Sequence, residues 1–100
     1  MIYITQLIYL QAGQEAVFEA FEEMALPLIP RYGGTLCLRI RPDKAAWIAG
    51  AMEQPYEIHL VSFPDQDSID AFMQDDGRKQ FLHLKEQSIR MAWLIQGRKI

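Results

Sequence analysis

The order in which strand-like and helical hydrophobic patterns follow one another constrains the fold of this chain more than any single motif. Runs typical of strands cover residues 2–10, 35–41, 56–63 and 91–96, and helical patterns follow the first and the third of these runs. Before the second run, the segment 27–34 contains two prolines and a Gly-Gly pair, which are typical of a helix that stops before the chain reverses. We therefore predict an α+β protein with the order β-α-β-β-α-β and a four-stranded antiparallel sheet.

The composition is that of one ordinary globular domain. Of the 100 residues, 50% are hydrophobic and 23% are charged, so we expect residues 1–100 to form a single domain around one core. The net charge of -3 provides no broad positive field, which argues against nucleic acid or an anionic membrane as a partner. Because no apolar run approaches the roughly 18 residues of a membrane span, we expect a soluble cytoplasmic protein.

No motif for a cofactor or a metal stands out. The single cysteine, Cys37, excludes an internal disulfide and provides no cysteine pair for a metal. Gly33 and Gly34 follow a helix rather than a strand, so they are interpreted as a helix stop and not as a phosphate-binding loop. We expect neither a cofactor nor a metal.

The helical patterns predict which side chains face the core. The apolar stripe of the first helix consists of Val17, Phe21, Met24 and Leu28, and Phe18 and Ala25 widen it. The opposite, solvent-facing side carries Glu15, Glu19, Glu22 and Glu23. Pro27 is expected to end this helix near Ala25. The second helical region is expected to begin with Asp67 as its N-cap and to be broken by Asp75-Asp76-Gly77.

The strands predict one face covered by helices and one open face. In the run 56–63, Ile58 and Leu60 are assigned to the helix-covered core, whereas Glu57 and His59 point to the open face. In the run 35–41, clean alternation places Leu36, Leu38 and Ile40 together on one face. The run 2–10 is apolar on both faces, so a lone chain would expose much of its open face. Two sheets packed face to face would cover it, and we predict a homodimer.

The turns between these segments resemble those of a known superfamily. Ala12-Gly13 leads into the first helix, Tyr32-Gly33-Gly34 leads into the second strand, and Phe63-Pro64 precedes an acidic cap. In these features the chain resembles the dimeric α+β barrel superfamily, and most of all its small uncharacterised bacterial domains. The resemblance implies a ferredoxin-like fold, a homodimer, and a cavity either between the helices and the sheet or within the barrel. Relatives include antibiotic-biosynthesis-type monooxygenases and muconolactone-isomerase-like enzymes, and fold kinship does not determine which activity is present.

Several polar and aromatic side chains are candidates for lining such a cavity. His59, Glu57 and Arg39 would bring together a proton carrier, a carboxylate and an anion-binding group. The remaining ligand-pocket candidates are Tyr9, Tyr3 and Trp93, the last of which equally suits core or dimer packing. The structural alternative is that Arg39 and Glu57 form an ordinary cross-strand pair.

Two functions remain open on the sequence alone. The first is a homodimeric domain of uncharacterised role that binds a small aromatic or anionic molecule. The alternative is a cofactor-independent monooxygenase or isomerase in which His59 acts as a base and Arg39 holds an anionic substrate. A closed cavity lined by His59 and aromatic side chains would favour the enzyme, whereas a filled barrel would favour the binding or structural function.

Overall fold

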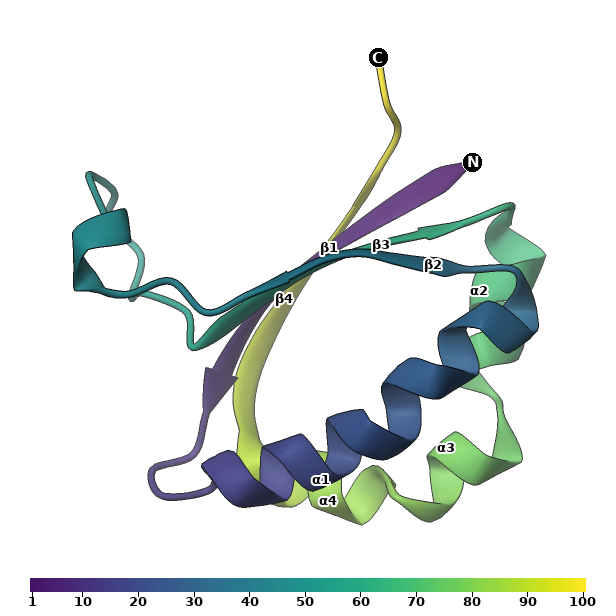
Figure 1. Cartoon of the computed structure of the whole chain (residues 1–100), viewed down its shortest axis with the longest axis horizontal. Helices are drawn as coiled ribbons and strands as arrows, with labels where there is room; N and C mark the ends of the chain where they lie inside the picture. Colours follow the sequence, from purple (N-terminus) through teal and green to yellow (C-terminus); the bar gives the residue numbers. More distant parts are fainter.

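The fold is a four-stranded sheet with helices on one side of it (Figure 1). The computed structural model describes residues 1–100. Its elements are β1 (Ile2–Leu10), α1 (Glu15–Ala25), η1 (Leu26–Tyr32), β2 (Thr35–Ile40), η2 (Lys44–Ala46), β3 (Glu57–Phe63), α2 (Gln66–Met73), α3 (Asp76–Gln80), α4 (Leu82–Ser88) and β4 (Ile89–Gly97). The strand order is β2-β3-β1-β4, every neighbouring pair is antiparallel, and β1 and β3 are central. This confirms the predicted ferredoxin-like fold. None of the helices has the length and hydropathy needed to cross a membrane.

The Gly-Gly pair ends the first helical segment. The α-helix ends at Ala25, as expected from Pro27, but the chain continues as the 3₁₀ helix η1 up to Tyr32. Gly33 then adopts a positive φ of 74°, a conformation that side chains with a Cβ rarely adopt. Gly34 is needed for space, because a Cβ there would lie 2.7 Å from Cγ2 of Ile29 and from Cε1 of Phe63.

The second helical region begins earlier than predicted. The N-cap of α2 is Asp65 rather than Asp67, because the Asp65 carboxylate accepts a 2.8 Å hydrogen bond from the backbone N–H of Ser68. The acidic segment after α2 both breaks the helix and starts the next one. Asp75 caps α3 by accepting a 2.9 Å hydrogen bond from the N–H of Arg78.

The assignment of strand faces in β3 is wrong. Val61 and Phe63, which share a face with His59, belong to the buried core cluster under the helices. Ile58 and Leu60 therefore lie on the open face and are only half-buried. Alternation identifies the residues that share a face, but the helices decide which face is covered, and they cover the one that carries His59.

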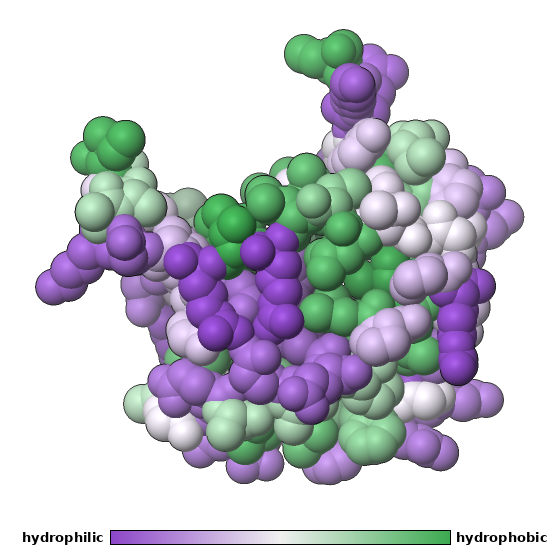
Figure 2. Space-filling model, viewed as in Figure 1, coloured by the Kyte–Doolittle hydropathy of each residue, from purple (hydrophilic) through white to green (hydrophobic).

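The open face is apolar along all the strands. In β2 the register shifts between Leu36 and Leu38, so the predicted clean alternation fails. Leu38 and Ile40 consequently pair with Leu60 and Ile58 on the open face. Figure 2 shows hydrophobic surface along the upper side of the sheet. The most exposed large hydrophobic side chains of this face are Leu38, Ile40, Trp93 and Ile95, each between 42% and 54% exposed.

Candidate functional site

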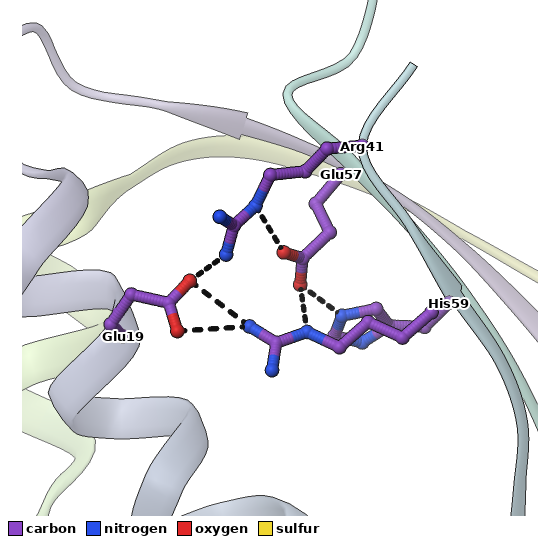
Figure 3. Close-up of polar contacts among 5 residues, drawn as sticks. Glu19, Arg41, Glu57 and His59 are labelled. Carbon is purple, nitrogen blue, oxygen red and sulfur yellow. Dashed lines mark hydrogen bonds and ion pairs between the residues drawn. The ribbon is translucent and has the colours of Figure 1, made fainter.

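A buried carboxylate, Glu57, organises an ion-pair network between the sheet and α1 (Figure 3). Its two oxygens accept 2.8 Å hydrogen bonds from Nε of Arg39 and Nε of Arg41, and Oε2 also contacts Nε2 of His59. Glu19 on α1 closes the network by binding both arginines, with 3.1 Å between its Oε1 and Nη2 of Arg39. The network therefore joins β2 and β3 to the first helix.

These contacts determine the charge of Glu57. Burial by itself would raise the pKa of its carboxyl group, but hydrogen bonds from His59, Arg39 and Arg41 outweigh burial and lower this pKa to about 2. Glu57 is therefore ionised near neutral pH and can only accept hydrogen bonds. When the His59 ring is neutral, Nε2 carries its proton and donates to Glu57. The other ring nitrogen, Nδ1, has no hydrogen-bond partner in the protein.

His59 also lines a cavity of about 220 Å³ between the sheet and the helices. The cavity has 18 lining residues, of which 13 are hydrophobic, including Phe21, Phe63 and Phe72. The polar lining residues are Gln6, Glu22, His59, Arg78 and Lys85, contributed by β1, α1, β3, α3 and α4. The cavity is thus an apolar chamber into which a few ionisable groups converge, as is common in small-molecule sites.

Glu22 is the most unusual of these polar groups. It is 5% exposed, and its carboxylate makes no hydrogen bond or ion pair. Burial raises the pKa of this carboxyl group. The prediction that Glu22 lies on the solvent-facing side of the first helix is therefore wrong. The sequence did indicate that Glu22 is buried, because the apolar residues Phe18, Phe21 and Ala25 surround position 22 at helical spacing, and all three are buried.

Two cations without ionic partners complete the cavity wall. Arg78 is 9% exposed, and its guanidinium carbon lies 5.5 Å from the centre of the Phe72 ring. Lys85 is half-buried and, like Arg78, forms no salt bridge. Burial lowers the pKa of both side chains. No periodicity singled out either residue, because each is one cation among several in a charged helical segment.

The sheet separates the ligand-pocket candidates that the sequence suggested. His59, Glu57 and Arg39 come together on the helix-covered face, and of these only His59 lines the cavity. Trp93 pairs with Leu7, which pairs on its other side with Ile58 of the open face. Tyr3 lies on the same face of β1 as Leu7, so Tyr3 and Trp93 both lie on the open face. Tyr9 is 2% exposed, and its hydroxyl donates a 2.8 Å hydrogen bond to the carbonyl of Glu53. One chain therefore does not bring all these residues into one pocket.

The structure contains no group of three or more His, Cys, Asp or Glu side chains arranged to hold a metal ion. Cys37, the single cysteine, is exposed. The ionisable groups of the cavity instead suit an organic ligand. Arg78 and Lys85 can bind an anion, whereas His59 and Glu22 can accept or donate a proton.

Comparison by sequence finds no matching protein-family profile and no matching curated protein. Comparison of structures finds the same fold in several solved proteins. A protein of unknown function from Rhodopseudomonas palustris superposes with a TM-score of 0.84 at 13% identity, over 99% of this chain and 82% of that one. A dimeric ferredoxin-like protein of unknown function from Jannaschia has a TM-score of 0.72 at 14% identity, over 98% of each chain. A dabb family protein with a ferredoxin-like fold from Mesorhizobium loti has a TM-score of 0.68 at 15% identity, over 99% of this chain and 96% of that one. At these identities the likeness establishes the fold alone.

Proposed function

We propose that this chain binds a small, mostly apolar organic anion in the cavity between the sheet and the helices. The observation that carries the proposal is that Arg78 and Lys85, neither of which has an ionic partner, line a chamber whose other residues are mainly hydrophobic. The buried Arg78 guanidinium has a 3.4 Å hydrogen bond from Nη1 to the carbonyl of Met73 but no salt bridge, and an anionic ligand would provide the missing counter-charge. The apolar walls would bury the rest of the ligand.

The size of the cavity limits the ligand. At about 220 Å³ it lies below the usual range of drug-sized pockets, which begins near 300 Å³. It exceeds the roughly 150 Å³ of an engineered apolar cavity that holds benzene. A single ring that carries a carboxylate, as in benzoate, therefore fits the volume and the charge.

We further propose that the protein is a homodimer. The apolar open face of the sheet supports this, because a surface such as that formed by Leu38, Ile40, Trp93 and Ile95 usually marks a contact with another chain. The Jannaschia protein of the same fold, described as dimeric, offers a precedent. The absence of a nucleic-acid partner and the cytoplasmic location stay predictions from the sequence.

Binding can be tested by titrating benzoate into the protein and following amide chemical shifts by NMR. Benzyl alcohol serves as the neutral probe of similar size. We expect benzoate to shift resonances of cavity residues and to bind at least about tenfold more tightly than benzyl alcohol, because charge-assisted contacts contribute about 1.5 to 3 kcal/mol.

A matched pair of variants locates the anion. Lys85→Met should weaken benzoate binding about tenfold or more, whereas Lys79→Met removes an exposed lysine of α3 and should leave binding unchanged. The proposal is wrong if benzoate shifts no cavity resonances, or if the two variants bind it equally well.

A further inference from the structure

Two ionisable groups on the cavity wall have unused hydrogen-bonding capacity. Nδ1 of His59 has no partner in the protein, and the Glu22 carboxyl makes no hydrogen bond or ion pair although it is 5% exposed. They come from different layers, His59 from the sheet and Glu22 from α1, and both line the same cavity. A ligand held between the layers would therefore lie within reach of both groups.

We propose that Glu22 and His59 are an acid–base pair that interconverts the keto and enol forms of a small aromatic α-keto acid. This inference rests on the anion site proposed above, since Arg78 and Lys85 would hold the carboxylate of the substrate. It adds to that site a reaction and a class of substrate.

His59 is positioned to act as the base. When the ring is neutral, the ionised Glu57 accepts from Nε2 and so favours the tautomer whose Nδ1 carries no proton. Arg39 and Arg41 anchor Glu57 in turn through 2.8 Å hydrogen bonds. A histidine oriented by a buried carboxylate in this way is a common arrangement for a general base.

Glu22 is positioned to act as the acid. The charged groups that affect it are His59, Glu57, Arg39, Arg78 and Lys85. Burial nevertheless prevails and raises the pKa of Glu22, while the pKa of Glu57 is lowered to about 2. Glu22 therefore keeps its proton to a higher pH than an exposed glutamate does, and from the cavity wall it can donate that proton to an oxygen of the ligand.

The proposed step balances without an oxidant or a cofactor. Nδ1 of His59 takes a proton from the carbon beside the keto group, and the electron pair of that C–H bond forms the carbon–carbon double bond. The π electrons of the C=O bond take the proton of the Glu22 carboxyl group, which yields the enol, an imidazolium and a carboxylate. His59 then releases its proton to water and Glu22 takes one up, so the net change is isomerisation alone.

Phenylpyruvate is the probe for this reaction. Ultraviolet absorbance measures the rate at which its enol form is lost. NMR in D₂O measures the rate at which deuterium enters its benzylic carbon. We expect the protein to accelerate both, and we expect Glu22→Gln and His59→Gln each to reduce the acceleration about 100-fold or more, as is usual for removing a general acid or base. Glutamine at position 59 keeps an N–H that can donate to Glu57.

Exposed neighbours provide the matched controls. Glu23→Gln on α1 and His83→Gln on α4 should leave both rates unchanged. Binding of phenylpyruvate, measured by NMR titration, should change less than about threefold in Glu22→Gln and His59→Gln, which also shows that the variants are folded.

The outcomes separate the two proposals. If phenylpyruvate and benzoate both fail to bind, the anion site and the reaction are both wrong. If they bind but the protein accelerates neither rate, or if Glu22→Gln reacts as fast as Glu23→Gln, the acid–base pair is wrong and the anion site stands.

Discussion

Nε of Arg39 donates a 2.8 Å hydrogen bond to Oε2 of Glu57 and so joins the edge strand β2 to the central strand β3. Arg39 lies directly opposite His59 in the register of these strands. Its two neighbours in β3, Glu57 and His59, therefore both lie on the helix-covered face. Arg39 does not line the cavity, whereas His59 does. The contact of Arg39 with Glu57 is therefore a diagonal cross-strand contact rather than a directly opposed pair, and it supports the histidine from outside the cavity.

The Glu57 network predicts a loss of stability in acid. The folded-state pKa of Glu57, about 2, lies below its ordinary value of 4.5. Its contribution to stability is therefore fully present above pH 4.5 and is lost as the pH falls from 4.5 towards 2. We expect this loss to be at most about 3.4 kcal/mol, at 1.36 kcal/mol for each pKa unit. Urea unfolding at a series of pH values measures it.

Glu57→Gln tests the origin of this acid loss. The variant should lose up to about 3 kcal/mol of unfolding free energy at pH 7, because it removes the buried carboxylate that the partly exposed Arg39 and Arg41 bind, and its stability should vary less between pH 4.5 and 2. The control is Glu53→Gln, which removes an exposed ion pair with Arg90 and should cost less than about 1 kcal/mol. Equal effects of the two variants would contradict the prediction.

Glu22→Gln should stabilise the protein at neutral pH. Because burial raises the folded-state pKa of Glu22, its destabilising effect is absent below pH 4.5 and grows as the pH rises above that value. We expect the variant to be more stable than the parent at pH 7 and equally stable at pH 4. Glu23→Gln, on the exposed side of α1, is the control in the same denaturation series. A loss of stability in Glu22→Gln at pH 7 would show that the carboxylate is favourably bound.

Gly34→Ala should destabilise the fold by about 1 to 3 kcal/mol, as overpacking of a filled site does. The added Cβ would lie 2.7 Å from side-chain atoms of Ile29 and Phe63, both of which are buried. Gly97→Ala is the control, because a Cβ at Gly97 meets nothing within 4 Å. Melting temperatures of the two variants provide the comparison, and an unchanged value for Gly34→Ala would refute the close packing.

Trp93→Glu should convert the proposed dimer into a monomer. The side chain is 49% exposed on the open face, and a carboxylate buried in a sheet-to-sheet interface would lose its hydration without a partner. Phe81→Glu removes a hydrophobic side chain of similar exposure, 37%, from the helical layer and should leave the dimer intact. Sedimentation velocity at micromolar concentration distinguishes the forms. A monomeric parent protein would overturn the dimer itself.

The local pattern of the sequence determined the elements of this protein and their order. Pro27 and the pair Gly33-Gly34 mark where the first helical segment ends, because backbone conformation at such residues depends on their own covalent structure. Alternation with a period of two likewise placed Glu57 and His59 on one face of β3. These features depend on residues close together in the chain, so they could be predicted without coordinates.

Only the tertiary structure decided which side of the sheet is covered and which polar groups meet there. The same alternation permits either face of β3 to be the core, and the packing of the helices selected the face with His59. The rotation of α1 about its axis buried Glu22, and α3 and α4 brought Arg78 and Lys85 to the same cavity. These contacts join residues far apart in sequence, so they arise from the way whole elements pack against one another rather than from local periodicity.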